Sequence, residues 1–131
     1  MLVKTIHSND APAAIGPYSQ ARVSCNLVFC SGQIALTAAG EDFTTEDVAT
    51  QTRIAMNNLK AVLQAANTNL SNAVKVTIYL LDMADFTSVN EVYASFFDGE
   101  PPARATVAVA GLPRGAKVEI DCIAAVPSNA C

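Results

Sequence analysis

Apolar residues recur every three to four positions in residues 46–66, which is the spacing of one face of an α-helix. Thr44 or Thr45 is expected to cap this helix. The acidic residues at positions 46 and 47 would occupy its first turn, where the helix dipole favours negative charge. The expected buried stripe consists of Val48, Ala55, Leu59, Val62 and Ala66. The polar residues expected on the rest of the helix are Gln51, Arg53, Asn57, Asn58, Lys60 and Gln64.

A second, more aromatic helix is predicted after Asp85, which is expected to cap it. Gly99 and the Pro101-Pro102 pair would end it, because neither residue type favours the interior of a helix. Its apolar stripe would pack on a sheet and consists of Phe86, Val89, Tyr93, Phe96 and Phe97.

The remaining apolar segments favour β-strands. Alternation with a period of two is clearest in residues 74–81, where every second residue is a large aliphatic one. The short Cys25-Asn26 connection is compatible with a hairpin, and residues 111–115 form a second loop between strands. The predicted strands cover residues 4–7, 21–24, 27–31, 74–81, 103–109 and 117–125.

This order of elements predicts an α+β fold. Strands on both sides of two helices imply one sheet that the helices cover on a single face. The chain contains no repeat, low-complexity tract or charge block, so one domain over residues 1–131 is expected. The uncovered sheet face needs another cover, for which a second subunit is the obvious candidate.

Composition supports self-association and disfavours several partners. Hydrophobic residues make up 51% of the 131 residues and charged residues only 15%, with a mean hydropathy of +0.29. The formal net charge is −4, which provides no electrostatic footprint for nucleic acid. No stretch approaches the roughly 18 apolar residues of a membrane span. The first ten residues resemble neither a secretory signal nor a transit peptide, so we expect a cytoplasmic protein without a membrane partner.

The cysteines and the single histidine offer little chemistry. The chain has no C-x-x-C pair, and His7 is its only histidine, so no metal site is predicted. His7 itself is expected to be a surface residue without a catalytic role. Cys25, Cys30 and Cys122 are interpreted as reduced, buried strand residues, and Cys131 as an exposed terminal residue.

Polar residues placed in otherwise apolar strands are the candidates for function. Arg104 and Thr106 share one face of their strand, and Glu119 and Asp121 share one face of theirs. If residues 103–109 and 117–125 pair as a hairpin, Thr106 faces Glu119 and Arg104 is its diagonal neighbour. The result would be either an anion pocket or a structural ion pair of Arg104 with Asp121 or Glu119. Signatures of nucleotide binding and of common hydrolases are absent.

Several blocks of the sequence resemble the RidA (YjgF) family. They lie in the family's order and spacing over nearly the whole chain. They are Ala13-Ala14-Ile15-Gly16-Pro17-Tyr18, Ser31-Gly32-Gln33-Ile34, Asp85-Phe86 through Val89-Asn90, Pro102-Ala103-Arg104, Leu112-Pro113, Lys117-Val118-Glu119-Ile120 and Ile123-Ala124. The resemblance implies a chorismate-mutase-like fold with a mixed sheet. It also implies a homotrimer whose sheets form a central barrel, with ligand sites in the clefts between subunits.

The resemblance further implies a cofactor-free deaminase. Such an enzyme hydrolyses 2-aminoacrylate-type enamines and their 2-imino acid tautomers, 2-iminopropanoate and 2-iminobutanoate, to 2-keto acids and ammonia. By position, Arg104 would bind the substrate carboxylate and Glu119 would activate water. The other expected substrate-binding residues are Tyr18, Ser31, Gly32, Asn90 and Thr106.

Three positions depart from the family pattern. Thr106 replaces a frequent cysteine, Ala35 replaces a proline, and Pro101 replaces an aromatic residue. The first removes a thiol, and the other two would change the shape of the pocket. Two other functions stay open, a non-catalytic metabolite-binding or chaperone-like protein and a translation-inhibiting endoribonuclease, which the acidic composition disfavours.

Overall fold

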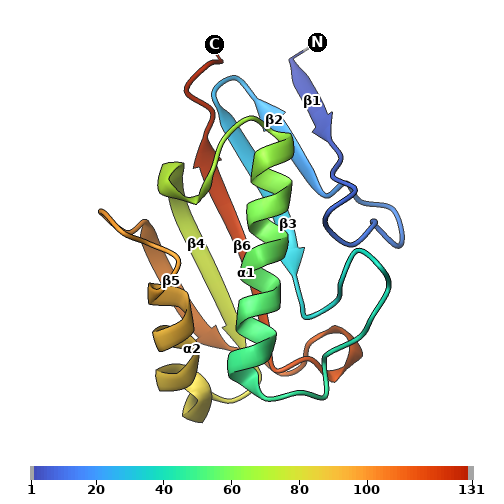
Figure 1. Cartoon of the computed structure of the whole chain (residues 1–131), viewed down its shortest axis with the longest axis vertical. Coiled ribbons are helices and arrows are strands. Elements are labelled where there is room, and N and C mark those ends of the chain that lie inside the picture. The colour runs from blue at the N-terminus through green and yellow to red at the C-terminus, as the bar shows by residue number, and fades with distance from the viewer. Residues whose placement is uncertain (1, 130–131) are drawn as a thin grey trace.

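The computed structural model describes residues 2–129, which form six strands and two α-helices (Figure 1). In chain order these elements are β1 (Val3–Ile6), β2 (Ala21–Ser24), β3 (Leu27–Gln33), α1 (Val48–Ala65), β4 (Ala73–Leu80), α2 (Phe86–Ala94), β5 (Ala103–Ala108) and β6 (Val118–Ala125). Short 3-10 turns cover Leu70–Asn72, Met83–Asp85 and Pro113–Gly115. Within residues 2–129 no helix is both long and apolar enough to cross a membrane.

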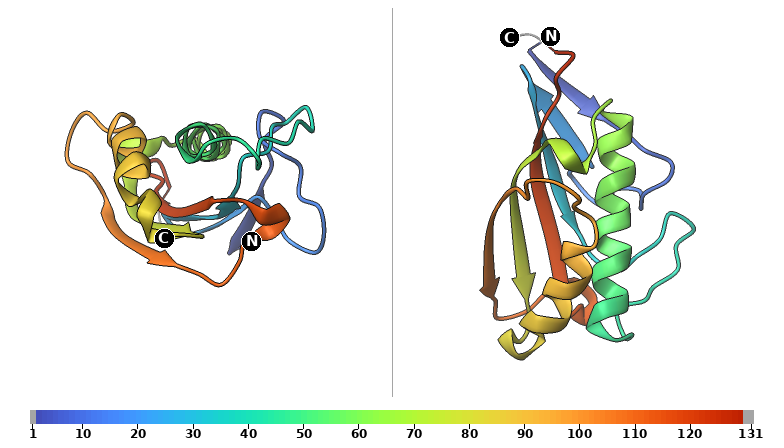
Figure 2. Two further views of the ribbon diagram at one scale, coloured as in Figure 1. Left: turned by 90° about the horizontal axis from the view of Figure 1, so that it is seen from below. Right: turned by 60° about the vertical axis from the view of Figure 1, so that its left-hand side comes forward.

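The strands form one mixed sheet in the order β1-β2-β3-β6-β4-β5. Neighbouring strands are antiparallel except for β4 and β5, which are parallel. Both helices lie on the same face of this sheet, with α1 in front of β3 and β6 and α2 beside β4 and β5 (Figures 1 and 2). The predicted α+β fold with one covered face is therefore confirmed.

The two faces of the sheet differ in polarity and exposure. The helix-covered face supplies the core, including Val76, Ile78 and Ile120, each at most 1% exposed. On the opposite face, which we call the open face, Phe29 and Val107 remain 45% and 43% exposed. In the described part of the chain no helix covers this face (Figures 1 and 2).

The predicted hairpin at Cys25-Asn26 is confirmed. Ser24 pairs with Leu27 in the β2–β3 ladder, and Cys25 adopts the positive φ of 54° that such a two-residue connection needs. Cys25 therefore lies in the turn rather than in a strand, is only partly buried and is disulfide-bonded. The prediction of a buried, reduced strand thiol is wrong for this residue.

The same prediction is confirmed for Cys30 and Cys122, which are buried free thiols opposite each other on β3 and β6. The hydrogen bond between their side chains, together with burial, raises the pKa of the Cys122 thiol well above its usual range. Both side chains thus act as small core residues. Cys131 lies outside the described residues.

Strands β5 and β6 do not form the hairpin that the sequence suggested, because β4 lies between them. The crossover through α2 places β5 parallel to β4 on one side, and residues 109–117 then carry the chain to the other side of β4. Alternate side chains of β4 are fully buried, because the helices cover one face of the sheet, and the backbone of β4 is paired along both edges. The expected facing of Thr106 and Glu119 is therefore wrong.

Helix α1 begins later than predicted. Its cap is Asp47, whose side chain accepts a hydrogen bond from the Thr50 amide at 2.9 Å, and not Thr44 or Thr45. Thr44 is instead buried and donates its hydroxyl proton to Asp42 at 2.6 Å. The predicted apolar stripe is buried throughout.

Two polar residues of α1 that were expected at the surface are buried. Gln51 is 0% exposed, because its side chain donates to the carbonyls of Thr44 and Glu46 and accepts from the Lys117 amide. Asn58 likewise donates to the Leu36 carbonyl at 2.7 Å. Both side chains form hydrogen bonds with backbone groups of neighbouring loops, which would otherwise be buried without partners.

Helix α2 starts after Asp85 as predicted, but the Asp85 side chain makes no capping bond. Asp82 caps the preceding turn instead, accepting from the Ala84 amide at 2.9 Å. The helix ends at Ala94, so Phe96 and Phe97 lie in the following loop, where they still pack on the core. Gly99 and the Pro101-Pro102 pair therefore come several residues after the end of the helix, and the prediction that they end it is wrong.

Candidate active site

Arg104 projects from β5 toward α2, on the helix-covered face. In the parallel ladder Arg104 lies beside Val76 and Thr106 beside Ile78, and both β4 residues face the core. The Arg104 Nη1 group donates a hydrogen bond to Asn90 Oδ1 at 2.6 Å. Arg104, Asn90 and Thr106, three of the residues predicted to form the site, are thus brought to one place.

Two aromatic rings of α2 also hold the Arg104 guanidinium. Its central carbon lies 5.6 Å from the centroid of the Phe86 ring and 5.1 Å from that of Tyr93. Contacts at this distance attract a cation to the face of a ring. The sequence analysis placed both rings in a buried stripe and missed this role, although residues 86, 90 and 93 have the spacing of one helix face.

A cleft of about 490 Å³ opens beside this guanidinium. It is lined by Asn90, Tyr93, Ala94, Phe97, Gly99, Pro101, Pro102 and Arg104. Asn90 accepts from only one N–H group of Arg104, so the guanidinium group retains other N–H donors for a planar anion such as a carboxylate. The cleft can therefore bind a small carboxylate.

Two hydroxyl groups near Arg104 are buried and lack partners among residues 2–129. They are the Tyr93 hydroxyl and Thr106 Oγ1. Burial raises the pKa of the Tyr93 hydroxyl, and the nearby Arg104 charge only partly opposes this effect. The tyrosine therefore stays neutral at physiological pH.

Glu119 lies on the open face of the sheet. Its neighbours Val118 and Ile120 are fully buried on the helix side, so Glu119 and Asp121 point the other way. Within one chain Arg104 and Glu119 are thus on opposite faces, and the expected convergence is wrong. The alternative ion pair of Arg104 with Glu119 or Asp121 is wrong too, since the single ion pair among residues 2–129 joins Arg114 and Asp42 at 3.3 Å.

A β-bulge in β3 contains Ser31 and Gly32, which together oppose Asp121, and it brings Gly32 against the Glu119 carboxyl group. The β3–β6 register shifts between Cys30 and Gln33, so that two residues of β3 oppose one residue of β6. A Cβ atom on Gly32 would overlap Glu119 Oε2 and lie 2.8 Å from its Cδ. Only glycine therefore lets the carboxyl group approach the β3 backbone this closely.

The Glu119 carboxyl group is partly buried beside a second acid. Burial raises its pKa above the usual glutamate value, and the negative charge of Asp121 raises it further. Asp121 accepts a hydrogen bond from the Tyr79 hydroxyl at 3.0 Å, which fixes its position on the open face. A carboxylate with a raised pKa is a suitable proton acceptor near neutral pH.

Tyr18 and Ser31 line a second cleft, of about 520 Å³. Ser31 Oγ donates to the Ser19 carbonyl at 2.6 Å, whereas the Tyr18 hydroxyl accepts from the Ile15 amide at 3.3 Å and is partly exposed. Gly16, with a φ of 123°, allows the turn before Pro17 that presents this phenol. The lining residues are Gly16, Pro17, Tyr18, Ser19, Ala21, Arg22, Phe29 and Ser31.

The predicted site residues therefore fall into two groups. The cation group is Arg104, Asn90 and Thr106 on the helix-covered face, and the carboxylate group is Glu119, Gly32, Ser31 and Tyr18 around the open face. Two of the positions that depart from the family pattern lie in different surroundings. Pro101 lines the Arg104 cleft, whereas Ala35 is fully buried.

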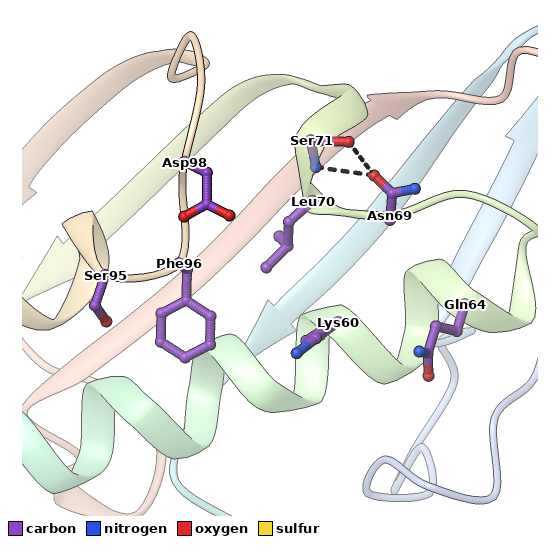
Figure 3. Close-up of a pocket in the computed structure, with 8 residues that line it drawn as sticks. All are labelled: Lys60, Gln64, Asn69, Leu70, Ser71, Ser95, Phe96 and Asp98. Atoms are coloured by element: carbon purple, nitrogen blue, oxygen red, sulfur yellow. Dashed lines mark hydrogen bonds between the residues drawn. The ribbon is translucent and has the colours of Figure 1, made fainter.

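Other parts of the described chain carry less chemistry. His7 is hydrogen-bonded to Asn9. Residues 2–129 contain no cluster of three or more His, Cys, Asp or Glu side chains that could hold a metal ion. A further hollow between α1 and the loop after α2 contains none of the predicted site residues (Figure 3). It is lined by Lys60, Gln64, Asn69, Leu70, Ser71, Ser95, Phe96 and Asp98.

Comparison with known proteins finds similarity over nearly the whole chain. The model of the family described as Endoribonuclease L-PSP matches residues 8–126. Protein DfrA of Myxococcus xanthus is 54% identical over 126 residues, covering 95% of this chain and 96% of that protein. The Mus musculus protein named 2-iminobutanoate/2-iminopropanoate deaminase is 45% identical over 121 residues, covering 92% and 90% of the two chains. The crystal structure of E. coli TdcF with bound serine matches with a TM-score of 0.88 at 40% identity, covering 93% of this chain and 98% of that one.

Proposed function

Because the chain belongs to the RidA (YjgF) family, whose model is described as Endoribonuclease L-PSP, we propose that it is an imine deaminase. Its substrates are 2-imino acids such as 2-iminopropanoate and 2-iminobutanoate, together with the enamine tautomers from which they form. The products are 2-keto acids and ammonia. The observation that carries the proposal is the Arg104 guanidinium, held by Asn90 and two rings with donors left free at the mouth of a cleft.

Arg104 binds the substrate carboxylate. Its planar fork gives two parallel N–H bonds to a carboxylate, which orient the molecule as well as hold it. The Asn90 contact and the two rings limit the rotamers that Arg104 can adopt, so less entropy is lost on binding. Thr106 Oγ1, which lacks a partner among residues 2–129, can donate to the same carboxylate or to a water molecule.

The complete site assembles from two copies of the chain. Arg104 and Glu119 lie on opposite faces of one sheet, so a substrate that touches both requires two chains. The exposed Phe29 and Val107 on the open face supply an apolar surface for this contact. We expect the assembly to be a homotrimer whose sheets form a central barrel, with each cleft lined by the cation group of one copy and the carboxylate group of another.

Glu119 acts as the general base. It accepts a proton from a water molecule while the water oxygen attacks C2 of the imine, which gives a tetrahedral aminoalcohol. Glu119 gives this proton to the nitrogen and then transfers the hydroxyl proton of the aminoalcohol to the same nitrogen. The C–N bond breaks with its electron pair on nitrogen as the C=O bond forms, so ammonia leaves the 2-keto acid. The imine carbon is already electrophilic, so no cofactor is needed. Tyr18, Ser31, the Gly32 backbone and Asn90 orient the substrate and the water.

A coupled assay tests this function. Purified protein is added to a threonine or serine dehydratase with its amino acid, and the appearance of keto acid is compared with the spontaneous rate. We expect acceleration by the wild type and a fall in kcat/KM of at least about 100-fold for Arg104→Ala, because two charge-assisted hydrogen bonds are lost.

The matched control is Arg53→Ala, which removes an exposed arginine from α1 and should keep the wild-type rate. Wild-type acceleration by Arg104→Ala would contradict the proposed role of Arg104. If the wild type accelerates neither reaction, the deaminase assignment itself is wrong.

Two alternatives predict other results. A non-catalytic metabolite-binding or chaperone-like protein would bind 2-keto acids without turning over any imine. The family's description as an endoribonuclease predicts RNA cleavage, which the net charge of −4 disfavours. RNA cleavage that survives repurification and is lost in Glu119→Ala would favour the endoribonuclease. The cytoplasmic location stays a prediction, which cell fractionation would check.

A further inference from the structure

The cleft beside Tyr18 and Ser31 contains a cation that the proposed reaction does not use. Arg22 lies on β2 and is exposed, and it pairs in register with Phe29, which in turn pairs with Ile123 of β6. These three residues form one row across the open face. Arg22 is the one charged residue among the eight that line this cleft.

No acidic side chain among residues 2–129 neutralises Arg22. The single ion pair in this part of the chain involves Arg114, on another part of the surface. Arg104 is held by Asn90, and the Arg114 side chain by Asp42, but no hydrogen bond to the Arg22 guanidinium is found within these residues. Its five N–H donors are therefore available to a ligand.

We propose that Arg22 is a specificity-determining residue that favours 2-imino acids with a second carboxylate at the end of the side chain. This inference rests on the proposed deaminase function. The substrate class is that of 2-imino dicarboxylates, which carry one carboxylate on C2 and another two or three carbons away.

The strand register supports this reach. Ser31 follows Phe29 by two positions on β3, and Phe29 is opposite Arg22, so the Cα atoms of Arg22 and Ser31 are about 8 Å apart by standard strand spacings. Gly32, next to Ser31, touches Glu119. A substrate whose C2 carbon lies at Glu119 can thus extend its side chain past Ser31 toward the Arg22 guanidinium.

The charge pattern gives the chemical reason. With the C2 carboxylate bound by Arg104 of one copy, a purely apolar side chain would leave Arg22 of the other copy without an anion. A distal carboxylate would give it a bidentate partner. If Arg22 were only a solvated surface residue, the distal group would make no difference to binding.

Binding of two stable 2-oxo acids tests the inference. 2-Oxoglutarate and 2-oxopentanoate have the same number of carbons, and only the first has a distal carboxylate. By calorimetry we expect the wild type to bind 2-oxoglutarate about tenfold more tightly, the size typical of one hydrogen-bonded charged group. In Arg22→Ala this preference should fall to about one, and in Arg22→Glu it should reverse. Arg53→Ala should retain the wild-type preference.

The outcomes separate the inference from the proposed function. Equal binding of both acids by the wild type, or an unchanged preference in Arg22→Ala, overturns the role of Arg22 and leaves the deaminase intact. If the wild type binds neither acid, the carboxylate site proposed above fails, and this inference fails with it. Because the wild-type preference alone can refute the role of Arg22, the test does not depend on the folding of a variant.

Discussion

The two faces of the sheet hold their functional side chains in different ways. On the helix-covered face, Arg104 is fixed by other side chains, namely Asn90 and the rings of Phe86 and Tyr93. On the open face, the place of Glu119 depends on the backbone of β3, because Gly32 carries no Cβ atom that would overlap its carboxyl group. The cation is thus positioned by helix packing, and the carboxylate by strand geometry.

This difference predicts different sensitivities. A guanidinium held by several weak contacts tolerates the loss of one of them, since the others still limit its position. The position of the Glu119 carboxyl group depends on one feature, the missing Cβ atom of Gly32, so no second contact compensates when that feature is lost. Substitutions on the open face should therefore disturb catalysis more than comparable ones around Arg104.

Among substitutions that change only the positioning of Arg104 or Glu119, the largest effect is expected for Gly32→Ala. The added Cβ would overlap the Glu119 carboxyl group, so the side chain must move from its place. We expect kcat to fall by about 10- to 100-fold, because a misplaced general base loses its alignment with the reacting atoms. The coupled deaminase assay measures the kcat of this variant against that of the wild type.

Gly111→Ala is the matched control for this glycine. A Cβ atom at Gly111 meets nothing within 4 Å, and Gly111 lines neither of the two clefts described above. Its kcat should stay near the wild-type value. Equal losses in the two variants would show that the close approach of Gly32 to Glu119 has no special role.

A smaller effect is expected for Phe86→Leu, which removes one ring from Arg104 but keeps an apolar side chain. The loss of one cation–π contact should raise KM about threefold with little change in kcat, as expected for an interaction that serves substrate binding. Phe96→Leu, at a partly buried ring outside the set of contacts with Arg104, should leave KM unchanged. A fall in kcat rather than a rise in KM for Phe86→Leu would contradict a role in carboxylate binding.

The smallest effect concerns pH. Glu119 must be ionised to accept a proton, so activity should fall on acidification at a higher pH than an ordinary glutamate would give, because burial and Asp121 raise its pKa. Asp121→Asn removes the negative charge and should move this acidic limb of kcat/KM to lower pH, while Tyr79 can still donate to the amide oxygen. A limb that moves to higher pH, or stays in place, would contradict the interaction between the two acids.

Local patterns in the sequence predicted most of the fold. The stripe of α1, the alternation in β4 and the hairpin at Cys25-Asn26 are all confirmed, because each depends on residues close together along the chain. The cap of α1 was placed too early because Thr44 and Asp47 are both good capping residues. In the structure the Thr44 hydroxyl is engaged by Asp42, two residues earlier, and by the carbonyl of Arg114, which is distant in the sequence, so Asp47 is left to cap the helix.

Long-range pairing limited the prediction of the site. The residue types were identified from the sequence, but their grouping assumed that β5 and β6 are neighbours. Insertion of β4 between them depends on the crossover through α2, which no local pattern encodes. The contacts of Phe86 and Tyr93 with Arg104 could have been inferred, because these residues share a helix face with Asn90.

Complementation between two inactive variants tests the central claim most directly, that each site takes Arg104 from one copy and Glu119 from another. Arg104→Ala and Glu119→Gln are co-expressed in equal amounts with different tags, and assemblies carrying both tags are assayed with the dehydratase. In a trimer that carries both tags, one of the three sites draws both intact residues, whichever variant is present twice. The mixed assemblies should therefore restore about one third of the wild-type rate. Mixed assemblies as inactive as the two parent variants would contradict a site shared between chains.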